Sequence, residues 1–79
     1  MRLDKYLKVS RIIKRRTIAK EACDAGRVTL NGKPAKSGAE VKVGDMLEIQ
    51  FGSNRSKYEI TALQETVRKE EAGGLYRLV

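Results

Sequence analysis

Three adjacent cations, Lys14, Arg15 and Arg16, precede a segment that is typical of a short helix. A helix N-terminus presents unpaired N–H groups and partial positive charge, so it attracts anions such as phosphate. Cations crowded there repel one another, and a partner that neutralises them would recover that cost. Arginine also makes bidentate contacts with phosphate or with a guanine edge. The stretch therefore predicts contact with a polyanion, and the alternative is pairing with the protein's own acids at positions 21, 24, 70 and 71.

The excess positive charge lies in the first half of the chain. Residues 1–36 contain eleven Lys or Arg and three acids, whereas residues 37–79 contain six and seven, and the whole chain carries +7. This asymmetry favours a nucleic-acid-binding face over a merely solvated charged surface. The candidate RNA-binding residues are Arg2, Lys5, Lys8, Arg11, Lys14, Arg15, Arg16, Lys20, Arg27, Asn31, Lys33 and Lys36. For Asn31, turn geometry is the simpler explanation.

Residues that could support catalysis or bind a metal are scarce. The chain has no His and one cysteine, Cys23, which cannot form a zinc site and is expected in the core. The adjacent acids Glu70 and Glu71 are the only general acid–base candidates, and such pairs in a polar tail are usually solvated. We therefore predict a binding protein without catalytic residues, metal or cofactor.

Aromatic residues are also few. Tyr6, Phe51 and Tyr58 are predicted on core faces, so stacking of successive bases is not expected. Recognition of folded RNA by shape and phosphate contacts is favoured instead.

A chain of 79 residues has room for one compact domain. No apolar run approaches the roughly 20 residues that span a bilayer, and the first residues lack the apolar centre of a signal peptide. We expect a soluble, cytoplasmic monomer without membrane contact.

Helical periodicity predicts a first helix over residues 2–13, and a second helix follows over residues 17–25. In the first, Leu3, Tyr6, Leu7, Val9, Ser10 and Ile13 share one face, and Asp4, Lys5, Lys8 and Arg11 share the polar face. The second helix is expected to be capped by Thr17, to end near Ala25 and to be closed by Gly26. Its narrow apolar stripe is expected to consist of Ile18, Ala22 and Ala25, with Ala19 and Cys23 at the edge.

The pattern then changes to strands. Asn31-Gly32 predicts a tight hairpin between Val28–Leu30 and a short edge strand over residues 33–36, limited by Pro34. A turn at Gly44-Asp45 leads into a strand that contains Leu47, Ile49 and Phe51, and the loop over residues 52–56 precedes another around Tyr58 and Ile60. We predict an α+β fold in which two N-terminal helices pack on a small, mostly antiparallel sheet. Residues 1–63 form the domain, and the tail over residues 64–79 docks on it, with one helical turn broken at Gly73-Gly74.

Four motifs occur together in residues 1–51: R-L-D-K-Y-L, R-R-T-x-A-K-E, G-R-V-x-L-N-G and V-x-x-G-D. On these motifs the chain resembles the S4-type RNA-binding domain, also called the alpha-L motif. With its K-E-E-A tail, it is similar to the RqcP type of ribosome-associated quality-control factor and, more distantly, to ribosome-associated heat-shock proteins. The resemblance implies an alpha-L fold with Arg2 and Arg16 as the principal RNA contacts and Lys5, Arg11 and Arg15 beside them.

The same resemblance implies binding to ribosomal RNA and tRNA on the bacterial large ribosomal subunit, in rescue or quality control of stalled nascent chains. A nascent-chain tailing factor is the implied protein partner. Two alternatives remain open: a helix-turn-helix DNA-binding regulator that uses residues 17–25, and a fragment of an RNA-modifying enzyme.

Overall fold

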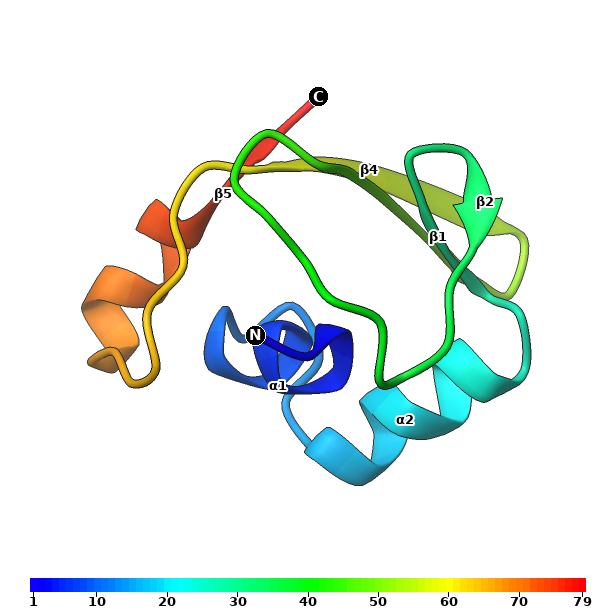
Figure 1. Ribbon diagram of the computed structural model, residues 1–79, viewed down its shortest axis with the longest axis horizontal. Coiled ribbons are helices and arrows are strands. Elements are labelled where there is room, and N and C mark those ends of the chain that lie inside the picture. Colours follow the sequence, from blue (N-terminus) through cyan, green and yellow to red (C-terminus); the bar gives the residue numbers. More distant parts are fainter.

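The computed structural model describes all residues, 1–79, and shows helices on one face of a five-stranded antiparallel sheet (Figure 1). The spatial order of the strands is β2-β1-β3-β4-β5. The predicted α+β class, with two N-terminal helices on an antiparallel sheet, is confirmed. The elements in chain order are α1 (Leu3–Val9), α2 (Arg16–Asp24), β1 (Val28–Leu30), β2 (Lys33–Pro34), β3 (Met46–Phe51), β4 (Asn54–Ile60), the 3₁₀ helix η1 (Lys69–Leu75) and β5 (Tyr76–Leu78).

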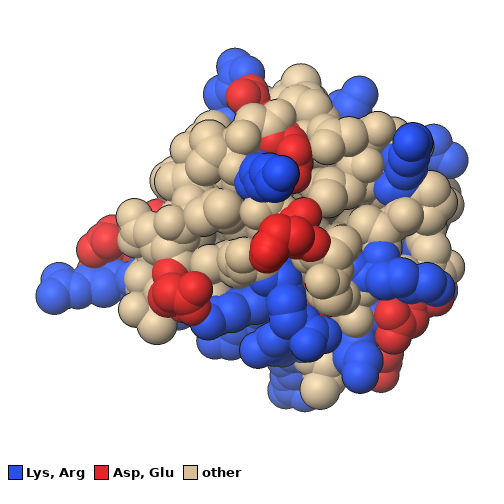
Figure 2. Space-filling model, in the orientation of Figure 1, with Lys and Arg blue, Asp and Glu red and all other residues tan.

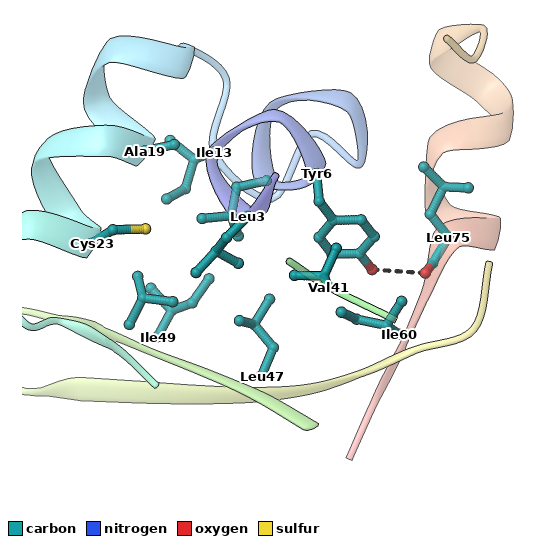
Figure 3. Close-up of a cluster of buried hydrophobic side chains, with 12 residues drawn as sticks. Leu3, Tyr6, Ile13, Ala19, Cys23, Val41, Leu47, Ile49, Ile60 and Leu75 are labelled. Atoms are coloured by element: carbon teal, nitrogen blue, oxygen red, sulfur yellow. Dashed lines mark hydrogen bonds between the residues drawn. The ribbon is translucent and has the colours of Figure 1, made fainter. Parts of the chain in front are cut away.

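One layer of apolar side chains joins the helices to the sheet. Leu47, Ile49 and Ile60 point from the strands toward Leu3 and Tyr6 of α1 (Figure 3). Burying side chains of this size contributes about 1.5–3 kcal/mol each. The Tyr6 hydroxyl donates a hydrogen bond of 2.7 Å to the backbone carbonyl of Leu75. Helix α1 is therefore held against the sheet and against the C-terminal segment.

Helix α1 is shorter than predicted, and the expectation of one helix over residues 2–13 is wrong. The helix ends at Val9, and Arg11 adopts a left-handed backbone with φ of 63°. This turn brings Ile13 back into the core although it lies outside the helix. Asp4, expected on the polar outer face, is also buried, because it packs beneath two arginines.

The predicted cap of the second helix is wrong by two residues, since the observed N-cap is Arg15, and the predicted centre of its apolar face is wrong by one. Helix α2 begins at Arg16 with no side-chain cap, so Thr17 lies inside it. Ala19 and Cys23 are buried, whereas Ile18 and Ala25 are exposed. The small side chains of Ala19 and Cys23 let α2 pack closely on α1, so these residues form the buried stripe. Gly26 follows the helix with φ of 76°, as predicted.

The predicted hairpin is confirmed. Asn31 and Gly32 have φ of 53° and 84°, and β2 lies at the edge of the sheet, where the missing N–H of Pro34 is tolerated. Strand β2 is shorter than predicted, because it ends at Pro34.

The second half of the sheet differs from prediction at the β3–β4 connection. The turn contains only residues 52–53, so β4 begins within the predicted loop. Phe51, the last residue of β3, is exposed, so its predicted core position is wrong.

The C-terminal segment lies against the domain. Ala72 and Leu75 are buried, and β5 pairs with β4. The 3₁₀ helix continues through Gly73 and Gly74, so the predicted break there is wrong. The predicted domain boundary at residue 63 stays a prediction. None of the helices has the length and apolar character that crossing a membrane requires.

Candidate nucleic-acid interface

Five predicted cations line a single hollow of about 430 Å³, here called the basic groove. They come from α1, from the connection between the helices and from the start of α2, while the C-terminal segment supplies the remaining wall. The groove is lined by Lys5, Lys8, Val9, Arg11, Lys14, Arg16, Glu65, Thr66 and Val67. Residues far apart in the chain thus build one surface of high positive charge.

Local backbone geometry explains why these cations converge. Lys5 and Lys8 are three residues apart on α1 and therefore share one side of the helix. The left-handed conformation of Arg11 turns the chain at the end of α1. As a result, the connection that carries Arg11 and Lys14 borders the same hollow as the helix.

The groove is positively charged because most of its cations have no acidic partner. Lys8, Arg11 and Lys14 are exposed and make no ion pair. Lys5 pairs with Glu65, the one acid that lines the groove. In the space-filling view, Lys and Arg side chains gather along the lower edge, where Figure 1 places α1 and α2 (Figure 2).

Two further arginines meet at a buried carboxylate. Arg2 Nε lies 3.2 Å from Asp4 Oδ1, and Arg16 Nε lies 3.4 Å from Asp4 Oδ2. Asp4 also accepts a hydrogen bond of 2.8 Å from the backbone N–H of Lys5. Only 3% of Asp4 is exposed, whereas the Arg2 and Arg16 side chains are 54% and 47% exposed. Asp4 therefore orients both arginines while leaving about half of each free for a ligand.

The same contacts fix the charge of Asp4. Burial raises the pKa of its carboxyl, but the Arg16 hydrogen bond, the Lys5 amide and the charges of Arg16 and Arg2 outweigh burial and hold this pKa below its ordinary value. Asp4 is therefore ionised at neutral pH. Arg2, Lys5 and Arg16 do pair with acids of the protein itself. Their partners are Asp4 and Glu65, and not the acids at positions 21, 24, 70 and 71 that the sequence suggested.

The other predicted residues lie outside the basic groove. Arg15 and Lys20 are exposed at the start and middle of α2, and Arg27, Lys33 and Lys36 are exposed around the hairpin. The Asn31 side chain is engaged within the protein: its Nδ2 donates to Asp45 Oδ1 at 3.1 Å, and its Oδ1 accepts from the Met46 N–H at 2.9 Å. These bonds tie the hairpin to the turn before β3.

The face of the sheet opposite the helices is more nearly balanced in charge. Directly paired residues share a face, which places Glu48 beside Lys57 and Gln50 beside Arg55 on this outer surface. Arg55 pairs with Glu48 at 3.6 Å, and Arg77 pairs with Glu59 on β4. An approaching polyanion is therefore attracted mainly to the side that carries the basic groove.

Sequence reasoning missed three contributors from the C-terminal segment, Glu65, Thr66 and Val67. Nothing in the local pattern marks them, because their role depends on where a distant segment packs. Helical spacing marks Asp4 only as a polar residue on the outer face of its helix. Its signal was the spacing Arg2-x-Asp4, which puts a cation and an acid within reach of each other.

The single cysteine, Cys23, is buried, as the sequence predicts. Burial raises the pKa of the Cys23 thiol to about 11, with smaller contributions from the charges of Asp4 and Asp24, so the thiol is protonated at neutral pH. No three His, Cys, Asp or Glu side chains come together as metal ligands would.

The fold and the groove together correspond to a known domain. The model of the S4 domain family matches residues 1–47, more than half of the chain. The chain therefore belongs to the S4 domain family, and the resemblance seen in its motifs is confirmed.

Individual relatives are similar over nearly the whole chain. The RQC P-site tRNA stabilizing factor of Halalkalibacterium halodurans is 62% identical over 78 residues, covering 99% of this chain and 89% of that protein. The protein of the same name from Bacillus subtilis is 49% identical over 79 residues, covering 100% of this chain and 92% of that protein. Among solved structures, heat shock protein 15 of Vibrio cholerae, described as trimeric, superposes with a TM-score of 0.93 at 31% identity, covering 100% of this chain and 81% of that one.

Proposed function

We propose that the protein binds structured RNA through the basic groove and the neighbouring Arg2 and Arg16. The observation that carries this proposal is the convergence of five cations on one hollow, three of them without an acidic partner. Such clusters are stabilised when phosphates replace the missing counter-charges. Exposed guanidinium groups oriented by Asp4 supply fixed hydrogen-bond donors of the kind that phosphate accepts in pairs.

The names of the relatives support a proposal for which RNA is bound. Their names describe factors that stabilise tRNA in the P site during ribosome-associated quality control. We therefore propose that this protein is a cytoplasmic monomer that contacts tRNA and ribosomal RNA on the large ribosomal subunit during quality control of stalled nascent chains. A factor that tails the nascent chain would be its partner in that process.

The helix-turn-helix alternative has less support. In that reading the exposed side of α2 enters a DNA major groove. This side carries the acids Glu21 and Asp24 beside Lys20, whereas all three unpaired groove cations belong to α1 and the connection. Acids on a reading helix repel phosphate, so α2 is poorly suited to that role.

The test measures RNA affinity as a function of salt. For the wild-type protein and a labelled tRNA, the logarithm of the association constant should fall with the logarithm of salt concentration with a slope of about −3 to −6. A flat response would contradict the proposal.

Substitutions locate the contact on the surface. Lys8→Ala and Lys14→Ala should each weaken binding and reduce the magnitude of the slope by about 1, because each removes one phosphate contact. Lys57→Ala is the matched control, since Lys57 is an exposed lysine on the outer face of the sheet. Equal losses in all three variants would show that net charge, and not the basic groove, determines binding.

A further inference from the structure

One acidic side chain lies among the cations of the basic groove. The Glu65 carboxylate accepts a hydrogen bond from Lys5 Nζ, and the two side chains are 60 positions apart in sequence. The Glu65 side chain is 73% exposed, so it stays accessible at the groove surface although it pairs with Lys5. A carboxylate at this position should weaken the binding of any ligand that presents only phosphates.

The placement of Glu65 follows from two apolar contacts. Leu63 and Val67 flank it in sequence, and both are partly buried against the core. Residues 63–67 make no backbone–backbone hydrogen bond. The segment is therefore fixed over the groove by these two side chains, with Glu65 between them.

The chemistry of a carboxylate determines which ligand it can tolerate. The hydrogen bond and the charge of Lys5 lower the pKa of Glu65, so this group is ionised at neutral pH and only accepts hydrogen bonds. It repels phosphate oxygens. RNA, unlike DNA, carries a 2′-hydroxyl donor beside each phosphate. When RNA binds, a phosphate can replace Glu65 as the ion-pair partner of Lys5. A 2′-hydroxyl can then replace Lys5 as the hydrogen-bond donor to Glu65.

We propose that Glu65 is a specificity-determining residue that accepts a hydrogen bond from a ribose 2′-hydroxyl in the basic groove. The proposal rests on the RNA-binding function proposed above. Glu65 then favours RNA over DNA, because it repels the phosphates of both backbones and only RNA offsets this repulsion with a hydrogen bond from its 2′-hydroxyl.

The experiment compares three ligands of one stem-loop sequence: RNA, the same RNA with 2′-O-methyl groups, and DNA. The methylated RNA keeps the phosphates but cannot donate from the 2′ position. The wild-type protein should bind RNA about five- to tenfold more tightly than the methylated RNA, which is within the ordinary net range of a single hydrogen bond, because Glu65 is exposed to water. In Glu65→Gln this preference should fall to about twofold or less, and DNA should gain affinity.

Glu70→Gln is the matched control. Glu70 is an exposed acid on η1 outside the groove, so the variant changes net charge equally and should retain the wild-type preference for RNA. If Glu65→Gln strengthens all three ligands by the same factor, Glu65 only reduces the charge of the groove, and the inference is overturned. If wild-type protein binds RNA with the expected salt slope but does not distinguish the methylated form, the inference fails while the RNA-binding function stands. Loss of salt-dependent RNA binding altogether overturns both.

Discussion

The cluster of Arg2, Asp4 and Arg16 makes a quantitative prediction for Asp4→Asn. The substitution removes the negative charge beneath two guanidinium groups but keeps an oxygen that can accept from the Lys5 N–H. Both arginines are about half exposed, so water screens each pair, and each contributes at most about 1 kcal/mol. We therefore expect Asp4→Asn to lower the free energy of unfolding at neutral pH by about 1–2 kcal/mol, less than the ~3–5 kcal/mol seen when fully buried pairs are broken.

The pH dependence gives the sharper measurement. The pKa of Asp4 is lower in the folded protein than its value of about 3.9 in the unfolded chain, so the unfolded chain takes up the proton first as pH falls. The stabilising contribution of Asp4 is therefore fully present above about pH 5 and is lost as pH falls through about 4 toward the folded pKa. Urea unfolding of wild type and Asp4→Asn at a series of pH values should show a difference that shrinks over this range.

Glu65→Gln serves as the control, because that carboxylate is exposed and its removal should barely change the urea midpoint. If the difference between wild type and Asp4→Asn is independent of pH, the carboxylate does not carry the charge assigned to it. A difference that grows as the solution is acidified would show that burial raises the pKa of Asp4 more than the arginines lower it.

Two further substitutions test how the fold is held. Tyr6→Phe removes one hydrogen bond to the buried Leu75 carbonyl, and it should lower the free energy of unfolding by about 1 kcal/mol in urea denaturation; an unchanged midpoint would mean that the N–H groups of Thr61 and Ala62, which also donate to this carbonyl, satisfy it without the hydroxyl. Gly32→Ala places a side chain at φ of 84° with no atom within 4 Å of the new carbon, so conformational strain alone should cost about 1 kcal/mol in the same assay. Gly73→Ala, equally open but without positive φ, should be close to neutral, and equal losses in both alanine variants would contradict the role of φ.

Features that depend on neighbouring residues could be predicted from the sequence. The hairpin follows from the backbone conformations that Asn31 and Gly32 tolerate, and the alternation of β3 follows from its position over the core. The fold class follows in the same way, and helical spacing places two of the five groove cations, Lys5 and Lys8, on one side of α1.

Features that depend on distant packing could not be predicted. A helical projection treats Asp4 as a solvent-facing acid, because it contains no information that Arg16 returns above it after the turn at Arg11. Glu65 belongs to the groove only because the C-terminal segment folds back onto α1. Phe51 follows the alternation of its strand with Leu47 and Ile49, which are buried, but Phe51 itself is exposed at the end of β3. A pattern of period two does not show where along a strand the core ends.

The contrast between the groove side and the outer face of the sheet has a kinetic consequence. A body with cations crowded on one side and nearly balanced charge on the other experiences a torque in the field of a nucleic acid. Such a molecule rotates as it diffuses and arrives with its groove foremost, so fewer collisions are wasted on unproductive orientations. Low salt should therefore raise the association rate constant by a larger factor than it lowers the dissociation rate constant.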